Sequence, residues 1–344
     1  MTTQHGRRQL LLIALVAVTL LVLIASIRYG AIDFSITEIA RALASLFPGR
    51  PEPTLDQRIF LELRFPRAIL CLLVGASLGV GGTLMQALFR NPIVEPGLVG
   101  TSSGAAFGSA LFFVLGGVFH IGASLWSLPL AACAGGVIST YLVFLLARSR
   151  EDGRASIVML LLTGLAVNAL FMSAIGFLSY IARDPQARSI TFWSLGTLSG
   201  ASWKAVEIVA LSTILGSIIA LRFAKQLNAL MIGEEEATYL GVNVNRLKWI
   251  ILSVNVVIVA VATAFTGVIS FVGLVVPHIL RMLGGADNRF LILGSALTGA
   301  TLLTLADLIA RLSVRPAELP IGIVTSAVGV PVFIFLLRRR QYMF

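Results

Sequence analysis

The side chains that could catalyse a reaction or hold a metal are few and far apart in this sequence. The three histidines, His5, His120 and His278, have no cysteine or carboxylate at the spacing of a metal site. The phosphate-binding motif G-x-x-x-x-G-K-S/T does not occur. The two cysteines, Cys71 and Cys133, make no disulfide framework. We therefore expect no catalytic residue, no metal and no bound cofactor.

Two carboxylates, Glu207 and Asp307, lie within apolar stretches, where an acid could carry a proton or a sodium ion. An ion-coupled transporter typically has such groups in the middle of its spans, and only Asp307 qualifies. We interpret Asp307 as a structural acid hydrogen-bonded to a neighbouring helix, with ion-coupled secondary transport as the alternative. The scarcity of these groups indicates that the energy source lies on another polypeptide.

The composition places these residues in a membrane. Hydrophobic residues make up 57% of the 344 residues, charged residues only 12%, and the mean hydropathy is +0.94. A water-soluble fold needs more polar surface than this. Apolar runs of roughly 20 residues predict helices rather than barrel strands. We expect an all-α, polytopic membrane bundle of about ten transmembrane helices, a single domain over residues 1–344. The runs fall at about 9–28, 68–89, 97–118, 123–147, 156–181, 204–222, 248–268, 271–284, 290–310 and 320–337.

Charge sets the expected orientation. The net charge of +10 is the difference between 26 basic residues (23 arginines and three lysines) and 16 acidic residues. The sequence lacks the aromatic-interleaved basic patch that binds nucleic acid. Arginines in the short loops favour both termini in the cytoplasm and contact with anionic membrane lipid. Residues 29–67 then lie on the outer side of the membrane and residues 223–248 on the cytoplasmic side. The outer side also carries arginines, which predicts an acidic partner there: Arg58, Arg64, Arg67, Arg311 and Arg315.

Three local patterns stand out between or within the spans. Ser35–Leu43 predicts a capped amphipathic helix that ends before Pro48, Pro51 and Pro53. Gly233–Gly241 predicts a short helix with three acids in its first turn and a glycine stop. Asn91–Gly97 contains two prolines and a glycine, so it cannot be regular helix and is expected either to be buried in protein or to line a cavity.

Glycines recur every four residues in two places, at Gly75 and Gly79 and at Gly100, Gly104 and Gly108. Each set lies on one helix face, where the lack of side chains lets a neighbouring backbone approach closely. The pattern predicts many tightly packed helices and names no ligand.

Four segments resemble the FecCD-type permeases of binding-protein-dependent ABC importers, which move iron–siderophore complexes, haem and cobalamin. These are Leu63–Arg67 (LRFPR), Met85–Gly104 (MQALFRNPIVEPGLVGTSSG), Gly267–Arg281 (GVISFVGLVVPHILR) and Ala317–Gly322 (AELPIG). The likeness runs from about Arg28 to the end of the chain.

This resemblance implies the type II ABC importer permease fold in a bacterial inner membrane. It implies a homodimer with the translocation path on its two-fold axis. Two cytoplasmic ATP-binding-cassette ATPase subunits bind the ATP, and one periplasmic substrate-binding protein delivers the cargo. The chain itself is then a translocation subunit and not an enzyme.

Site residues follow from the same resemblance. The positions that dock the binding protein are Arg64, Arg67 and Arg311. The positions that couple to the ATPase are Gly233, Glu234, Glu235, Glu236, Ala237, Tyr239, Leu240 and Gly241. The positions that narrow the path are Asn91 and Ile93, followed by Ser156, Ile157 and Val158. Relatives often carry a small hydroxylated pair where this chain has Ile157 and Val158, so its inner gate is expected to be more apolar.

The cargo follows from the AELPIG segment, which looks closer to haem and cobalamin permeases than to many siderophore permeases. We therefore expect haem first and a ferric siderophore next, with cobalamin as the alternative within the family. A non-transporting scaffold or receptor would not require the broken backbone of Asn91–Gly97.

Overall fold

The computed structural model describes residues 2–30, 32–47, 52–116, 126–147, 157–315 and 317–338, and the regular structure in these ranges is helical. Seven helices there are long and apolar enough to cross a membrane, and three shorter apolar helices accompany them. They correspond to the ten predicted runs, so the all-α membrane bundle is confirmed. The ten are α1 (Thr2–Arg28), α4 (Phe65–Leu88), α5 (Thr101–Leu115), α6 (Ser127–Leu146), α7 (Ile157–Ile181), α9 (Trp203–Arg222), α12 (Val244–Thr266), α13 (Val272–Gly284), α14 (Asn288–Ser313) and α15 (Ile321–Arg338).

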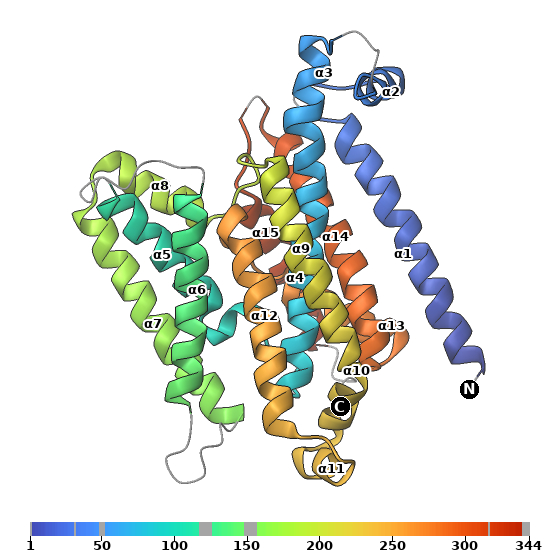
Figure 1. Ribbon diagram of the computed structural model, residues 1–344, viewed down its shortest axis with the longest axis vertical. Coiled ribbons are helices and arrows are strands. Elements are labelled where there is room, and N and C mark those ends of the chain that lie inside the picture. Colours follow the sequence, from blue (N-terminus) through green and yellow to red (C-terminus); the bar gives the residue numbers. More distant parts are fainter. Residues whose placement is uncertain are drawn as a thin grey trace.

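Short helices mark the two ends of this bundle. Figure 1 shows α2 (Ile36–Ala44) and α3 (Leu55–Ile59) at one end and α11 (Glu234–Tyr239) at the other. We call these the α3 end and the α11 end. Helices α4, α12 and α14 lie in the middle, α5, α6 and α7 lie to one side, and α1 lies at the opposite edge against α14.

Small residues bring the central helices together, as the glycine spacing predicted. A Cβ atom on Gly75 would collide with the backbone carbonyl of Gly299 on α14, and one on Gly79 would collide with that of Ser295. Thr83 adds a buried hydrogen bond of 2.8 Å from its hydroxyl to the Ser295 hydroxyl. Close backbone approach and short hydroxyl links are typical of helix packing in membranes, where there is no hydrophobic driving force between helices.

The same device joins α5 to α6. Cβ atoms on Gly104 and Gly108 would collide with the backbone of Gly135 and Ala131. Gly100, the first glycine of the predicted stripe, instead precedes α5 with φ of +90°. Its role is a left-handed turn, which a glycine adopts without steric cost.

The segment predicted to be periplasmic is more helical than expected. Ser35 caps α2 in a capping box with Glu38, and α2 ends at Ala44, as predicted. Of the three prolines proposed to end α2, Pro48 and Pro51 lie outside the described residues. Helix α3 continues through a π-helical turn (Phe60–Arg64) into α4, so one continuous helical stretch runs from Leu55 to Leu88.

Two further helices have no counterpart among the expected elements. Helix α8 (Asp184–Ser194) follows α7 and begins with an aspartate and a proline, which are favoured in a first helical turn. Helix α10 (Ala224–Ile232) occupies the first part of the predicted coupling segment and leads through Gly233 into α11. The segment 223–248 is therefore two short helices and the start of α12.

Candidate functional site

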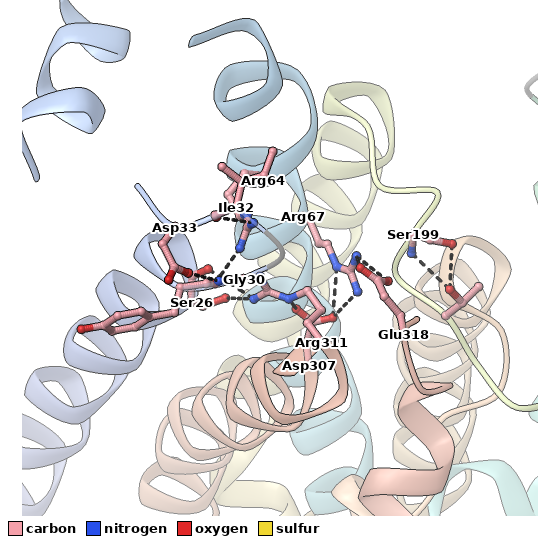
Figure 2. Close-up of polar contacts among 12 residues, drawn as sticks. Ser26, Gly30, Ile32, Asp33, Arg64, Arg67, Ser199, Asp307, Arg311 and Glu318 are labelled. Carbon is pink, nitrogen blue, oxygen red and sulfur yellow. Dashed lines mark hydrogen bonds and ion pairs between the residues drawn. The ribbon is translucent and has the colours of Figure 1, made fainter. Parts of the chain in front are cut away.

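A network of ion pairs lies at the α3 end of the bundle. Asp307 and Arg311 are one turn apart on α14, and the Arg311 Nε donates to Asp307 Oδ2 at 2.8 Å. Arg67, on α4, donates to Asp307 Oδ1 from Nη2 at 2.8 Å and from Nε at 3.1 Å. The other side of Arg67 pairs with Glu318 at 2.9 Å. Figure 2 shows how these four side chains converge from α4, from α14 and from the segment before α15.

Two arginines, Arg311 and Arg64, donate hydrogen bonds to the end of α1 and to the residues that follow it. Arg311 donates to the Ser26 hydroxyl at 2.8 Å and to the carbonyl of Tyr29 at 3.1 Å. Arg64 donates to the carbonyls of Tyr29 at 2.6 Å and Ile32 at 3.0 Å. Carbonyls at a helix C-terminus lack partners within the helix and carry partial negative charge, so guanidinium groups stabilise them.

These contacts place the three predicted docking residues in one cluster with different exposure. The Arg311 side chain is 4% exposed and that of Arg67 is 15% exposed. Arg64 is half-buried and forms no salt bridge with a carboxylate of the described chain. Arg311 is therefore a buried residue that links α14 to α1. Of the three arginines, Arg64 has the positive charge that is least neutralised by carboxylates of the described chain. A docking role for the three remains a prediction.

Asp307 is confirmed as an acid bonded to a neighbouring helix. Its side chain is 1% exposed and is shared by Arg67 and Arg311. The i,i+4 spacing of Asp307 and Arg311 was the available sequence signal for one of these pairs. A hollow of about 210 Å³ adjoins the network, lined in part by Arg67, Glu318 and Ser199.

The broken segment after α4 is held by two of its own side chains, one of which reaches the start of α13. Asn91 Oδ1 accepts a hydrogen bond from the Ile93 backbone N at 3.0 Å, which makes a local turn. Glu95 Oε1 accepts from the backbone N of Phe271 at 2.9 Å, where the chain enters α13. Phe271 has φ of +69°, a conformation that costs energy for a bulky side chain. The Glu95 contact stabilises this junction, and sequence patterns gave no sign of it.

Asn168 ties α7 to the same segment. Its Nδ2 donates to the Leu98 carbonyl at 3.1 Å, and its Oδ1 accepts from the Ser103 hydroxyl. These groups border a hollow of about 310 Å³ whose lining includes Glu95, Asn168 and Ser270. The broken backbone therefore borders a hollow whose lining is partly polar.

The predicted gate residues are only partly described. Ile93 is 46% exposed and Val158 is 64% exposed, while Asn91 is half-buried. Ile157 is the first residue of α7, and Ser156 lies outside the described residues. Their role in narrowing a path remains a prediction.

Helix α11 projects a mixed apolar and acidic surface at its end of the bundle. Tyr239 is 87% exposed and Leu240 is 66% exposed. Glu235 and Glu236 are also exposed, whereas Glu234 pairs with the buried Lys248 of α12 at 2.8 Å. One of the three predicted coupling acids therefore holds α11 to its own chain.

Two structural features support this short helix. Ala237 is the fully buried residue of α11, and it packs this helix against the rest of the chain. Gly241 has φ of +80°, and the Val242 N–H donates to the Ala237 carbonyl at 2.9 Å, which closes the helix. Gly233 provides the turn from α10. The predicted short helix with its glycine stop is confirmed.

Comparison with known proteins gives consistent matches over nearly the whole chain. Residues 18–339 match the FecCD transport family. The hemin transport system permease protein HmuU of Yersinia pestis is 45% identical over 284 residues, which cover 82% of this chain and 84% of that protein. The cobalamin import system permease protein BtuC of Halobacterium salinarum is 40% identical over 289 residues, which cover 84% and 76%.

A solved structure has the same fold. It is described as an inward-facing conformation of a metal-chelate type ABC transporter. The two chains superpose with a TM-score of 0.83 and 32% sequence identity, over 95% of this chain and 98% of the other.

Proposed function

The chain belongs to the FecCD transport family and is the transmembrane permease subunit of an ABC importer, and from this premise we propose that its cargo is an iron complex, with haem first. The observation that carries the proposal is the 45% identity to a hemin permease, against 36–40% for several cobalamin permeases. A ferric siderophore is the next candidate and cobalamin is the alternative.

We propose that two copies form the path between them, each copy being one permease domain. The exposed face of α7 supports this arrangement. It presents large apolar side chains, among them Leu165, Leu170 and Met172, each 62–64% exposed. The partly polar hollow beside Asn168 opens next to this helix. A second copy would cover the apolar face and leave the hollow on the path, where a cargo with both apolar and polar groups can pass.

The α3 end is proposed to be periplasmic and to receive the substrate-binding protein, with both termini cytoplasmic in the bacterial inner membrane. Arg64 supports this role because its positive charge has no carboxylate pairing within the described chain. Arg67 contributes a partly exposed guanidinium, and Arg311 keeps the end of α1 in place beneath them. Opposite charges on the partner would steer its approach and set its register.

The α11 end is proposed to bind the two ATPase subunits. An apolar pair, Tyr239 and Leu240, beside the exposed acids Glu235 and Glu236 suits a cleft with apolar walls and a basic rim. The permease lacks a nucleotide-binding motif, so movement of α11 by the ATPase would drive the switch between outward and inward access.

Ion-coupled transport receives no support from the buried acid. A proton carrier must exchange its proton with an aqueous path, whereas Asp307 is 1% exposed and paired with two arginines. This arrangement favours a fixed charge.

The test of the cargo is uptake by proteoliposomes that contain the permease with its ATPase and enclosed ATP. The substrate-binding protein is added outside with haem, a ferric siderophore or cobalamin. We expect accumulation of haem that requires both ATP and the binding protein. Equal or greater accumulation of cobalamin would reassign the cargo, and uptake without ATP would contradict the mechanism.

A further inference from the structure

A second polar network lies at the α11 end, around Asp287 at the start of α14. Asp287 Oδ2 pairs with the Arg8 Nη1 of α1 at 2.9 Å. Its Oδ1 accepts hydrogen bonds at 3.1 Å from the Asn228 Nδ2 of α10 and from the Arg289 backbone N. One carboxylate therefore joins three helices and caps one of them.

Both polar atoms of the Asn228 side-chain amide form hydrogen bonds with residues at the start of α14. While its Nδ2 donates to Asp287, its Oδ1 accepts from the backbone N and from the side-chain Nδ2 of Asn288, both at 2.8 Å. Asn288 is fully buried. The first N–H groups of a helix lack partners within the helix, so an amide from another helix that satisfies one of them makes a specific contact.

The other members of the network fix its surroundings. Arg8 donates from Nε to the Gly284 carbonyl at 2.8 Å, at the C-terminal end of α13, where a positive charge is favoured. Leu227 and Leu230, on either side of Asn228 in α10, are fully buried. Helix α10 therefore contacts the bundle through an apolar pair and through the Asn228 amide.

Asn228 lies between the helix at the α11 end and the long central helix α14. Only Gly233 separates the end of α10 from the start of α11, so the two helices are adjacent in the chain. Asn228 connects α10 to the first turn of α14. The 26 residues of α14 form a rod of about 39 Å whose far end carries Asp307 and Arg311. A single helix thus runs from the Asn228 contact to the ion-pair network at the α3 end.

We propose that the Asn228–Asp287 contact is the link through which displacement of α11 moves α14, and that both are positioning residues for coupling. This inference rests on the proposed function, in which an ATPase moves α11. The physical requirement is that α10 and the start of α14 move as one body, because coupling between distant sites needs a connected element that both sites bias.

The test compares Asn228→Ala with Gln226→Ala in the complete importer. Gln226 also carries an amide on α10 but makes no side-chain hydrogen bond with the described residues, so it is a matched control. For Asn228→Ala we expect the amount of cargo moved per ATP hydrolysed to fall about tenfold, as for the loss of a hydrogen bond to a charged group. For Gln226→Ala we expect the wild-type ratio. An unchanged ratio in Asn228→Ala, or an equal fall in the control, overturns the proposal.

A second measurement separates this inference from the proposed function. Hydrogen exchange of residues 224–239 is compared in the purified permease alone, in detergent micelles. We expect faster exchange in Asn228→Ala than in Gln226→Ala, and equal exchange overturns the link. If the wild-type importer moves no cargo with ATP, the proposed function fails while this measurement still tests the contact. Asn228→Ser replaces the alanine variant if that variant does not assemble.

Discussion

The substitution Asp307→Asn distinguishes between two roles of Asp307, that of a structural acid and that of an ion carrier. The carboxylate of Asp307 accepts three hydrogen bonds from the guanidinium groups of Arg67 and Arg311 in a buried setting. Asparagine keeps the size but loses the charge and one acceptor. Removing one partner of a buried ion pair costs about 3–5 kcal/mol. Since asparagine retains one acceptor oxygen, we expect the free energy of unfolding to fall by about 3 kcal/mol, at the lower end of that range.

The assay is thermal unfolding of the purified permease in detergent micelles, followed by tryptophan fluorescence. A loss of this size lowers the unfolding midpoint by about 4 °C in a chain of this length. Glu207→Gln, at an exposed carboxylate of α9, is the control, and we expect it to change the free energy of unfolding by less than about 0.5 kcal/mol. Combining Asp307→Asn with Arg311→Gln removes the excess positive charge and should recover part of the loss.

The result that would refute this reasoning is equally specific. An ion carrier predicts that Asp307→Asn unfolds at the wild-type temperature and yet moves no cargo. A structural acid predicts a lower unfolding temperature together with residual uptake by the molecules that remain folded. Normal stability with abolished uptake would therefore refute the structural role and favour the ion carrier.

Three further predictions follow from the surfaces and packing. Arg64→Glu should weaken association with the binding protein at least tenfold. The effect should be strongest at low salt, because charges at the surface are screened as the salt concentration rises. Surface plasmon resonance at two salt concentrations, with Arg41→Glu as the control, measures this affinity. Tyr239→Ala should weaken ATPase binding by about 2 kcal/mol, as for a central aromatic contact, measured by pull-down titration; full binding would rule out this surface. Gly79→Leu should prevent α4 from packing on α14 and so lower the yield of folded protein in size-exclusion chromatography. Gly176→Leu should leave the yield unchanged, because a Cβ atom at Gly176 meets no atom within 4 Å. Equal yields of the two variants would contradict the packing argument.

The elements that sequence predicted are those whose signals are local. Apolar runs long enough to span a bilayer became the ten main helices, because a backbone in lipid must satisfy its hydrogen bonds internally. The cap at Ser35 and the glycine stop at Gly241 set the ends of α2 and α11. The prolines between Asn91 and Gly97 broke the helix, leaving only a 3-10 turn at Pro96–Val99.

The features that sequence did not reveal depend on residues far apart in the chain. Arg67 and Asp307 are 240 positions apart, and the Glu95–Phe271 contact spans 176 positions. No periodicity encodes such pairs, because helix packing brings them together. Arg311 was expected to face outward from the charge pattern, whereas its contacts with Asp307 and Ser26 bury it. Helix α8 has no apolar run of membrane-spanning length, so the hydropathy pattern does not predict it.

In the function that we propose, this chain is a conduit moved by an ATPase bound at its α11 end. The most direct measurement places the permease in vesicles alone and with its ATPase and binding protein, and records haem uptake under a proton gradient, a sodium gradient or ATP. The account predicts accumulation only for the complete complex with ATP. Accumulation by the permease alone, driven by either ion gradient, would contradict it.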